Sequence, residues 1–335
     1  MNRWYVRYGI PAALLAVLLW RTEIWNAGDL IHDLRWWPAV IALLLNLPQL
    51  LPMTLRIRII LSRLGYSVRL GSLLPLAMFG NMASALTPAA SGEALRPIFY
   101  RDNFGVPIYR GAAAVFYERA YSFYLMALST LAAVALVFLP GPVIAPAVAV
   151  LILALFHAPA WLYPPLARLL LRATEVPLLA PVTRRAAVKS LLAEVNKTDR
   201  VTATLFSDFR LSLPVTAMTY AVFFVMALQF WFVLEAFDER LSLQEAWALL
   251  AVSYFVGTAS AIPLGLGAAD GVLVYLLTRF DVSTVASTTI ALAVRLTATL
   301  PYGIMGLLGY WQAVRLRQLA DGEAAPESVV AETAN

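Results

Sequence analysis

The segments SALTPAASGEALRP (Ser84–Pro97) and SAIPLGLGAADG (Ser260–Gly271) place charge, proline and glycine inside a chain that is otherwise strongly apolar. Both segments present serine, proline, glycine and an acidic residue in the same order. Charged and helix-breaking residues are costly in a bilayer, so they usually mark a site or a polar pathway. The two segments therefore predict helices that are interrupted inside a membrane.

The composition supports a membrane protein. The 335 residues are 61% hydrophobic and only 13% charged, whereas soluble domains are about half apolar and a quarter charged. The chain contains no cysteine, which excludes disulfides, thiolate nucleophiles and cysteine-bound metals. The net charge of +5 favours contact with anionic lipid over nucleic-acid binding. We find no nucleotide-binding or zinc motif, and we expect no cofactor and no metal.

The apolar runs predict an all-α polytopic membrane protein. About six runs are long enough to cross a bilayer, and they cover residues 8–25, 36–55, 112–139, 143–163, 211–237 and 285–311. Residues 72–90 and 246–280 are rich in proline and glycine, and they are expected to enter the membrane and leave on the same side. Such re-entrant backbone is tolerated where protein or a wet cavity satisfies its polar groups.

Basic residues set the expected orientation. Residues 168–210 are predominantly basic, and a run without any acid follows the second apolar run: Arg56, Arg58, Arg63 and Arg69. The positive-inside bias places both segments in the cytoplasm. Residues 238–245 are acid-leaning and are expected outside. Both termini then lie on the cytoplasmic side of a bacterial inner membrane.

The span count also predicts an inverted repeat. Three crossings separate the two re-entrant elements, and an odd number inverts one half relative to the other. Similar residues recur at offsets of about 175 positions between the halves. We assign residues 1–139 to the first repeat and 140–317 to the second. The second repeat includes a cytoplasmic amphipathic segment at 173–210, and a disordered acidic tail follows at 318–335.

Two motifs resemble those of a known family. The first contains Pro88, Gly92, Glu93 and Arg96, followed by Glu118 and Arg119 on the next span; the second contains Pro263, Gly265, Gly267, Asp270 and Arg295. This pattern is similar to the transmembrane region of lysylphosphatidylglycerol synthases, a flippase-like family, over residues 8–311. The second motif departs from the family, whose members often carry an Arg-Glu pair where this chain has Ala269-Asp270.

The resemblance implies transport, by flipping or scrambling, of a lipid with a phosphate-bearing head. The substrate-binding residues would be Glu93, Arg96, Glu118, Arg119, Asp270 and Arg295. The arginines would hold phosphate, and the acids would balance them or titrate. The backbone breaks at Pro88, Gly92, Pro263, Gly265 and Gly267 would line the site. Bifunctional relatives carry a synthase domain that this chain is expected to lack.

Two other function classes stay open. In the first, the protein is an enzyme acting on a polyprenyl-phosphate or phospholipid, with Asp29 or Asp33 in the first external loop as base or metal ligand. In the second, it is a non-transporting subunit that supports a lipid-synthesising enzyme. At the residue level, each charged pair could also be a purely structural ion pair. A lone histidine such as His157 is more often structural than a proton relay.

Overall fold

The computed structural model describes residues 32–138, 141, 144–155, 158–173, 186–262 and 265–323. All regular elements among these residues are helices, as the sequence predicts. The predicted span at 8–25 lies outside the described residues, as do Asp29, His157, Pro263 and the end of the chain from residue 324.

Four helices of the described residues are long and apolar enough to cross a membrane: Trp36–Arg63, Ile108–Val137, Phe209–Ala236 and Thr284–Gly309. They coincide with four of the predicted spans. The fifth, at 143–163, corresponds to two shorter helices, α8 (Ile144–Leu155) and α9 (Ala158–Ala173). The total of six spans and the re-entrant character of the broken helices stay predictions.

The first half contains a helix interrupted where the sequence predicts it. The order is α3 (Trp36–Leu44), α4 (Asn46–Arg63), α5 (Leu70–Leu86), the 3₁₀ helix η2 (Pro88–Leu95), α6 (Arg96–Phe104) and α7 (Ile108–Phe138). Thr87 is extended between α5 and η2. Pro88 lacks the N–H that would continue α5, so the chain turns there into a tighter helix.

The second half also contains an interrupted helix. Following α11 (Ala186–Ser207) come α12 (Phe209–Ala236), α13 (Leu243–Ala259), α14 (Ala268–Thr278) and α15 (Thr284–Glu323). The interruption between α13 and α14 turns through residues with positive φ, namely Ala261, Gly265 and Gly267. Glycine adopts this conformation without strain, which explains why this break is glycine-rich. The predicted segment at 173–210 thus contains a long helix, α11.

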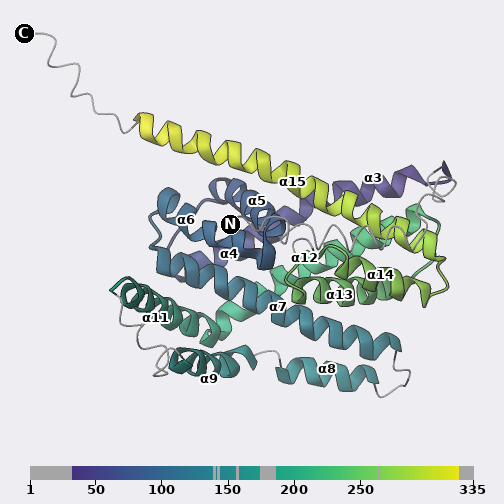
Figure 1. Ribbon diagram of the computed structural model, residues 1–335, viewed down its shortest axis with the longest axis horizontal. Coiled ribbons are helices and arrows are strands. Elements are labelled where there is room, and N and C mark those ends of the chain that lie inside the picture. Colours follow the sequence, from purple (N-terminus) through teal and green to yellow (C-terminus); the bar gives the residue numbers. More distant parts are fainter. Residues whose placement is uncertain are drawn as a thin grey trace, which may run out of the picture.

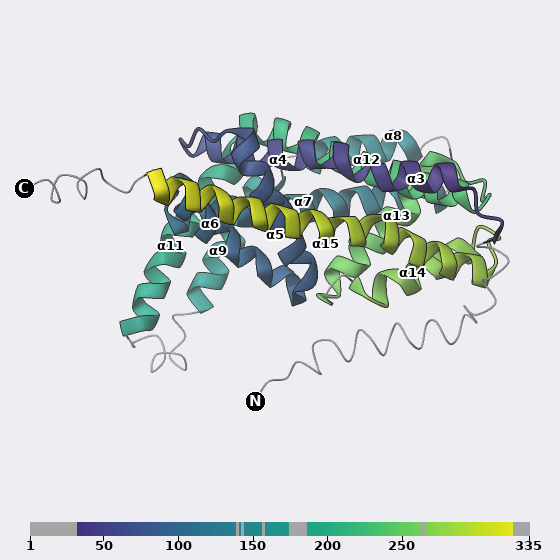
Figure 2. The same ribbon diagram turned by 90° about the horizontal axis from the view of Figure 1, so that it is seen from above.

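Helices of one half pack on helices of the other. The broken helix α5 lies along α15, α13 lies along α7, and α4 packs against α12 (Figure 1). Figure 2 shows the same bundle from above, with α15 again alongside α5. The contact of α5 with α15 is close because Gly306 and Gly309 leave room for Met82 and for the Pro75 carbonyl. Small residues allow such close approach of helix backbones in membranes.

One expectation is wrong. We predicted Arg56 in a cytoplasmic loop together with Arg58 and Arg63, but α4 continues to Arg63 and Arg56 is buried within it. Arg58 is exposed. Arg63 forms an ion pair with Asp208, which caps the first turn of α12. This contact holds the pKa of the Asp208 carboxyl below its usual value.

Candidate functional site: a buried cluster of five charges

Five charged side chains from α4, η2, α6 and α7 form one connected cluster. Its members are Arg56, Glu93, Arg96, Glu118 and Arg119. Four of these side chains are at most 7% exposed, and Arg119 is 41% exposed. Charges so deeply buried are retained only with partners close by.

Glu118 lies at the centre of the cluster. Its Oε1 accepts hydrogen bonds from Nε and Nη2 of Arg56 at 3.1 and 2.6 Å, and its Oε2 accepts one from Nη2 of Arg96 at 2.7 Å. Arg56 also donates to the hydroxyls of Ser122 and Thr219. The carboxylate therefore links α4, α6 and α7, and Arg56 extends the network to α12.

Glu93 lies between two arginines. Its Oε2 is 3.7 Å from Nη1 of Arg96, and its Oε1 contacts Nη2 of Arg119. Arg119 also donates to the Ser84 hydroxyl at 3.0 Å. The pairs of Glu93 with Arg96 and with Arg119 are those that the sequence suggested. Adjacent helical residues point about 100° apart, which explains why Glu118 and Arg119 take different partners.

The cluster is neither neutral nor fully hydrogen-bonded. Three guanidinium groups against two carboxylates leave one positive charge in excess. Neither oxygen of Glu93 accepts a hydrogen bond of good geometry, and the buried Nη1 of Arg96 and Nε of Arg119 donate none. Buried polar groups are normally satisfied. A net positive cluster with spare donors is suited to receive an anion.

Glycines shape the backbone around the cluster. A side chain at Gly92 would collide with the Ala83 carbonyl and the Thr87 hydroxyl. That hydroxyl accepts a hydrogen bond from the Gly92 N–H at 2.6 Å. A Cβ at Gly80 would lie 2.9 Å from Cδ of Arg96. The first broken segment therefore needs glycine at these positions to bring Glu93 and Arg96 against α7.

Asp270 and Arg295 form a second pair, in the other half of the chain. Arg295 Nε donates to Asp270 Oδ1 at 2.6 Å and Nη2 donates to Oδ2 at 2.7 Å, which is a bidentate arrangement. Asp270 Oδ2 also accepts from the Gly267 N–H, so the acid caps α14. Arg295 Nη2 is 3.4 Å from the Gly265 carbonyl. The predicted pairing is present, and it holds the second break in place.

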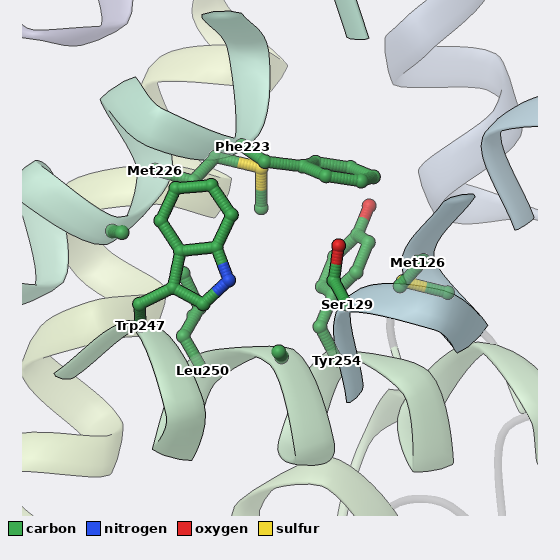
Figure 3. Close-up of a pocket in the computed structure, with 9 residues that line it drawn as sticks. Met126, Ser129, Phe223, Met226, Trp247, Leu250 and Tyr254 are labelled. Carbon is green, nitrogen blue, oxygen red and sulfur yellow. The ribbon is translucent and has the colours of Figure 1, made fainter. Parts of the chain in front are cut away.

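An apolar cavity opens between α7, α12 and α13, with a volume of about 20 Å³. Its lining is mostly apolar and includes Met126, Phe223, Met226, Trp247 and Leu250. Figure 3 shows the hydroxyls of Ser129 and Tyr254 on the same side of this space.

The cavity is connected to the charged cluster through α7. Arg119 and Met126 are seven residues apart, which places them on the same face of this helix. Tyr254, which lines the cavity, lies within electrostatic range of Arg119. Charge therefore stands at one end of this face and apolar surface about 10 Å further along.

Sequence reasoning found four members of the cluster and missed Arg56. A signal for Arg56 was present in the sequence, because it lies among apolar residues that repeat at helical spacing, such as Leu50, Ile57 and Ile60. This spacing indicates that the helix continues past Leu55 and includes Arg56. The polar partners Ser84, Ser122 and Thr219 could not be singled out, since serine and threonine are common in membrane helices. The place of Pro263 at the site lies outside the described residues.

The family profile described as "Lysylphosphatidylglycerol synthase TM region" matches residues 4–306. The chain belongs to this family. No curated protein matches the chain. Membership of the lysylphosphatidylglycerol synthase transmembrane family and the four long apolar helices indicate a multi-pass membrane protein related to lipid metabolism or transport. In this member of the family, both motifs named from the sequence are built around ion pairs.

Proposed function

We propose that the protein carries a lipid with an anionic, phosphate-bearing head across the bacterial inner membrane, as a flippase or scramblase. The observation that carries this proposal is the buried five-charge cluster, which has one excess positive charge and spare donors. A charge at the bilayer centre costs about 3 kcal/mol on insertion scales. Five charges with incomplete pairing are a costly way to build a purely structural core, and an anionic ligand accounts for the imbalance.

In this proposal Arg119 is the first contact of the phosphate. It is the most exposed member of the cluster, and its partner Glu93 makes no hydrogen bond of good geometry. A phosphate approaching Arg119 replaces one anion by another, so Arg119 keeps a counter-charge throughout the exchange. Arg96 is the next donor, through its Nη1, which is 3.7 Å from Glu93 Oε2 and donates no hydrogen bond. Arg56 and Glu118 position Arg96 and stay in place.

Exposed apolar side chains beside Arg119 favour a lipid rather than a free phosphate as the substrate. Phe116 and Phe123 lie three residues before and four residues after Arg119 on α7, so they share its face, and both are exposed. The cavity has room for a water molecule and not for an acyl chain, so the tails of a bound lipid would lie outside it, against this exposed face.

The order of helices and their mutual packing support an inverted repeat. α4, α5, α6 and α7 correspond in order to α12, α13, α14 and α15, and each broken helix packs on the long helix of the other half. In the proposed cycle, Asp270 and Arg295 form the second head-binding station, related to the first by the repeat. The two stations would serve opposite leaflets, and the lipid gradient or protons would supply the drive.

A vesicle assay tests the proposal. The purified protein is placed in vesicles with fluorescent phosphatidylglycerol, and translocation is followed by quenching of the outer leaflet. Arg119→Ala is expected to slow translocation about 10- to 100-fold, since it removes a charge-assisted hydrogen bond worth about 1.5–3 kcal/mol. Arg119→Lys keeps the charge without the planar fork and should be intermediate.

The matched control is Arg279→Ala. Arg279 is exposed at the end of α14, and its side chain contacts Tyr275, which is also exposed. It should translocate at the wild-type rate. An unchanged rate in a well-folded Arg119→Ala protein would remove Arg119 from the mechanism. If the wild type moves no lipid alone but co-purifies with a lipid-synthesising enzyme, the accessory role is correct. If Asp29→Asn or Asp33→Asn abolishes turnover of a lipid, the protein is an enzyme.

A further inference from the structure

Buried polar groups also gather away from the charged cluster, where α4, α12 and α15 meet. Asn46 and Gln49 on α4 are each 1% exposed, and Gln229 on α12 is 4% exposed. Asn46 lies directly after Leu45, the residue at which α3 passes into α4 while the backbone stays helical. Three buried amide side chains in an apolar environment are costly unless each is satisfied.

Prolines create acceptors at this place. Pro301 has no N–H, so the Thr297 carbonyl, four residues earlier in α15, has no helical donor. Asn46 Nδ2 and Gln229 Nε2 donate to this carbonyl at 2.7 and 3.1 Å. The same two amides also donate to the Leu43 and Ala42 carbonyls of α3. Their nitrogens are therefore fully used, which fixes where their oxygens point.

Two amide oxygens are left over. Asn46 Oδ1 and Gln49 Oε1 are buried and accept no hydrogen bond. The two residues are three apart on α4, so their side chains are neighbours on one helix face. Pro48, in the same turn, deprives the Leu44 carbonyl of its helical donor. This part of the bundle therefore has more oxygen acceptors than donors. Each buried acceptor without a hydrogen bond lowers the stability of the fold by about 1–3 kcal/mol.

We propose that Asn46 Oδ1 and Gln49 Oε1 bind a monovalent cation, sodium, at the junction of α3 and α4. Oxygen donors attract hard cations. The donors are neutral amides and carbonyls, which favours a single positive charge, because a divalent ion dehydrates reluctantly and is usually held by carboxylates.

The position gives this ion a role. Both oxygens belong to α4, and the amide nitrogen of Asn46 donates to the Thr297 carbonyl of α15, which Gln229 of α12 also contacts. An ion on Asn46 Oδ1 would therefore hold the side chain that joins these helices. Binding stabilises the state in which these helices are together. The site goes beyond the proposed lipid transport and does not depend on it, because the ion is detected without any lipid substrate.

Thermal unfolding of the purified full-length protein in detergent tests the site. Sodium chloride is compared with choline chloride and potassium chloride at equal ionic strength. We expect sodium to raise the unfolding midpoint by roughly 2–4 °C over choline. Direct binding of radioactive sodium gives a second measurement that does not depend on stability.

Two substitutions at one position have opposite expected effects. Gln49→Leu removes one oxygen and should abolish the sodium-dependent shift. Gln49→Glu adds a negative charge at nearly the same volume, so it should enlarge the shift. Gln244→Leu, at an exposed position on α13, is the control and should keep the wild-type shift.

The outcomes separate the ion from a bridging water. An identical midpoint in sodium and choline for the wild type overturns the proposal, since a water molecule would then satisfy both oxygens. A sodium shift that persists unchanged in Gln49→Leu and Gln49→Glu also overturns it, by placing the ion elsewhere. Radioactive sodium retained by the wild type and lost in Gln49→Leu supports it, even where Gln49→Leu lowers the stability of the protein.

Discussion

Arg56 and Arg58 are two residues apart on α4 but differ in burial and in the kind of group to which they donate. Arg56 is buried and donates to Glu118, whereas Arg58 is exposed and donates to the Val68 carbonyl. Arg56→Met should therefore cost about 3–5 kcal/mol, because it removes one partner of a buried carboxylate. Arg58→Met should change the free energy of unfolding by about 0.5 kcal/mol or less.

The measurement is the unfolding midpoint of both variants in the same detergent, together with their yield in the membrane fraction. Equal losses in the two variants would contradict the description of Glu118 as the centre of the cluster. Removing Glu118 as well should not restore the loss, because the buried Arg96 then loses its hydrogen bond to this carboxylate.

Prediction from the sequence succeeded for charged residues that lie within apolar segments, because such residues need a partner of opposite charge. A charge in apolar sequence must be paired, so Glu93 with Arg119 and Asp270 with Arg295 could be anticipated. It failed at Arg56, because the positive-inside rule counts basic residues near span ends without distinguishing the one that faces inward.

At the scale of elements, the contact of α5 with α15 depends on small residues. A Cβ at Gly306 would collide with the side chain of Met82, whereas a Cβ at Gly303 would meet nothing. Gly306→Ala should separate the two helices and destabilise the protein by about 1–3 kcal/mol through overpacking. Gly303→Ala, on the same helix, should be neutral or stabilising, because alanine is the better helix former.

Unfolding midpoints of the two alanine variants check this prediction. If Gly306→Ala is as stable as Gly303→Ala, α5 and α15 do not pack as closely as described.

The interruptions of the helices were the most predictable elements. Proline removes a backbone donor and glycine tolerates positive φ, so the residues at each break are enough to predict the ends of α5 and α13. The contact of Asn46 with Thr297 was not predictable in this way. It joins residues 251 positions apart, and only the packing of α4 on α12 and α15 brings them together.

At the scale of the whole molecule, the predicted inverted repeat and orientation can be tested by labelling. Because the chain contains no cysteine, a single introduced cysteine is the only reactive thiol. Lys197→Cys on α11 should react with a membrane-impermeant maleimide only after the cells are opened. Glu239→Cys, after α12, should react in spheroplasts, where the outer face is accessible.

Lys197 is exposed and Glu239 is partly exposed, and labelling of each cysteine in detergent-solubilised protein shows that it is accessible, so lack of labelling in cells then reports the side of the membrane. Labelling of both cysteines from the same side would disprove the assigned topology. The sequence allowed this prediction because charge in the loops sets orientation. It did not determine which helices of one half would contact the other, since apolar faces in a membrane are nearly interchangeable.

The exchange of packing partners between the halves has a consequence for synthesis. The ribosome completes α5 long before α15 exists, and α7 long before α13. The nascent first half can pair its five clustered charges with one another, but its interrupted helix α5 lacks its packing partner α15 until the end of synthesis. Deletions near the carboxyl end that remove α15 should therefore leave α5 uncovered and lead to proteolysis of the amino-terminal half.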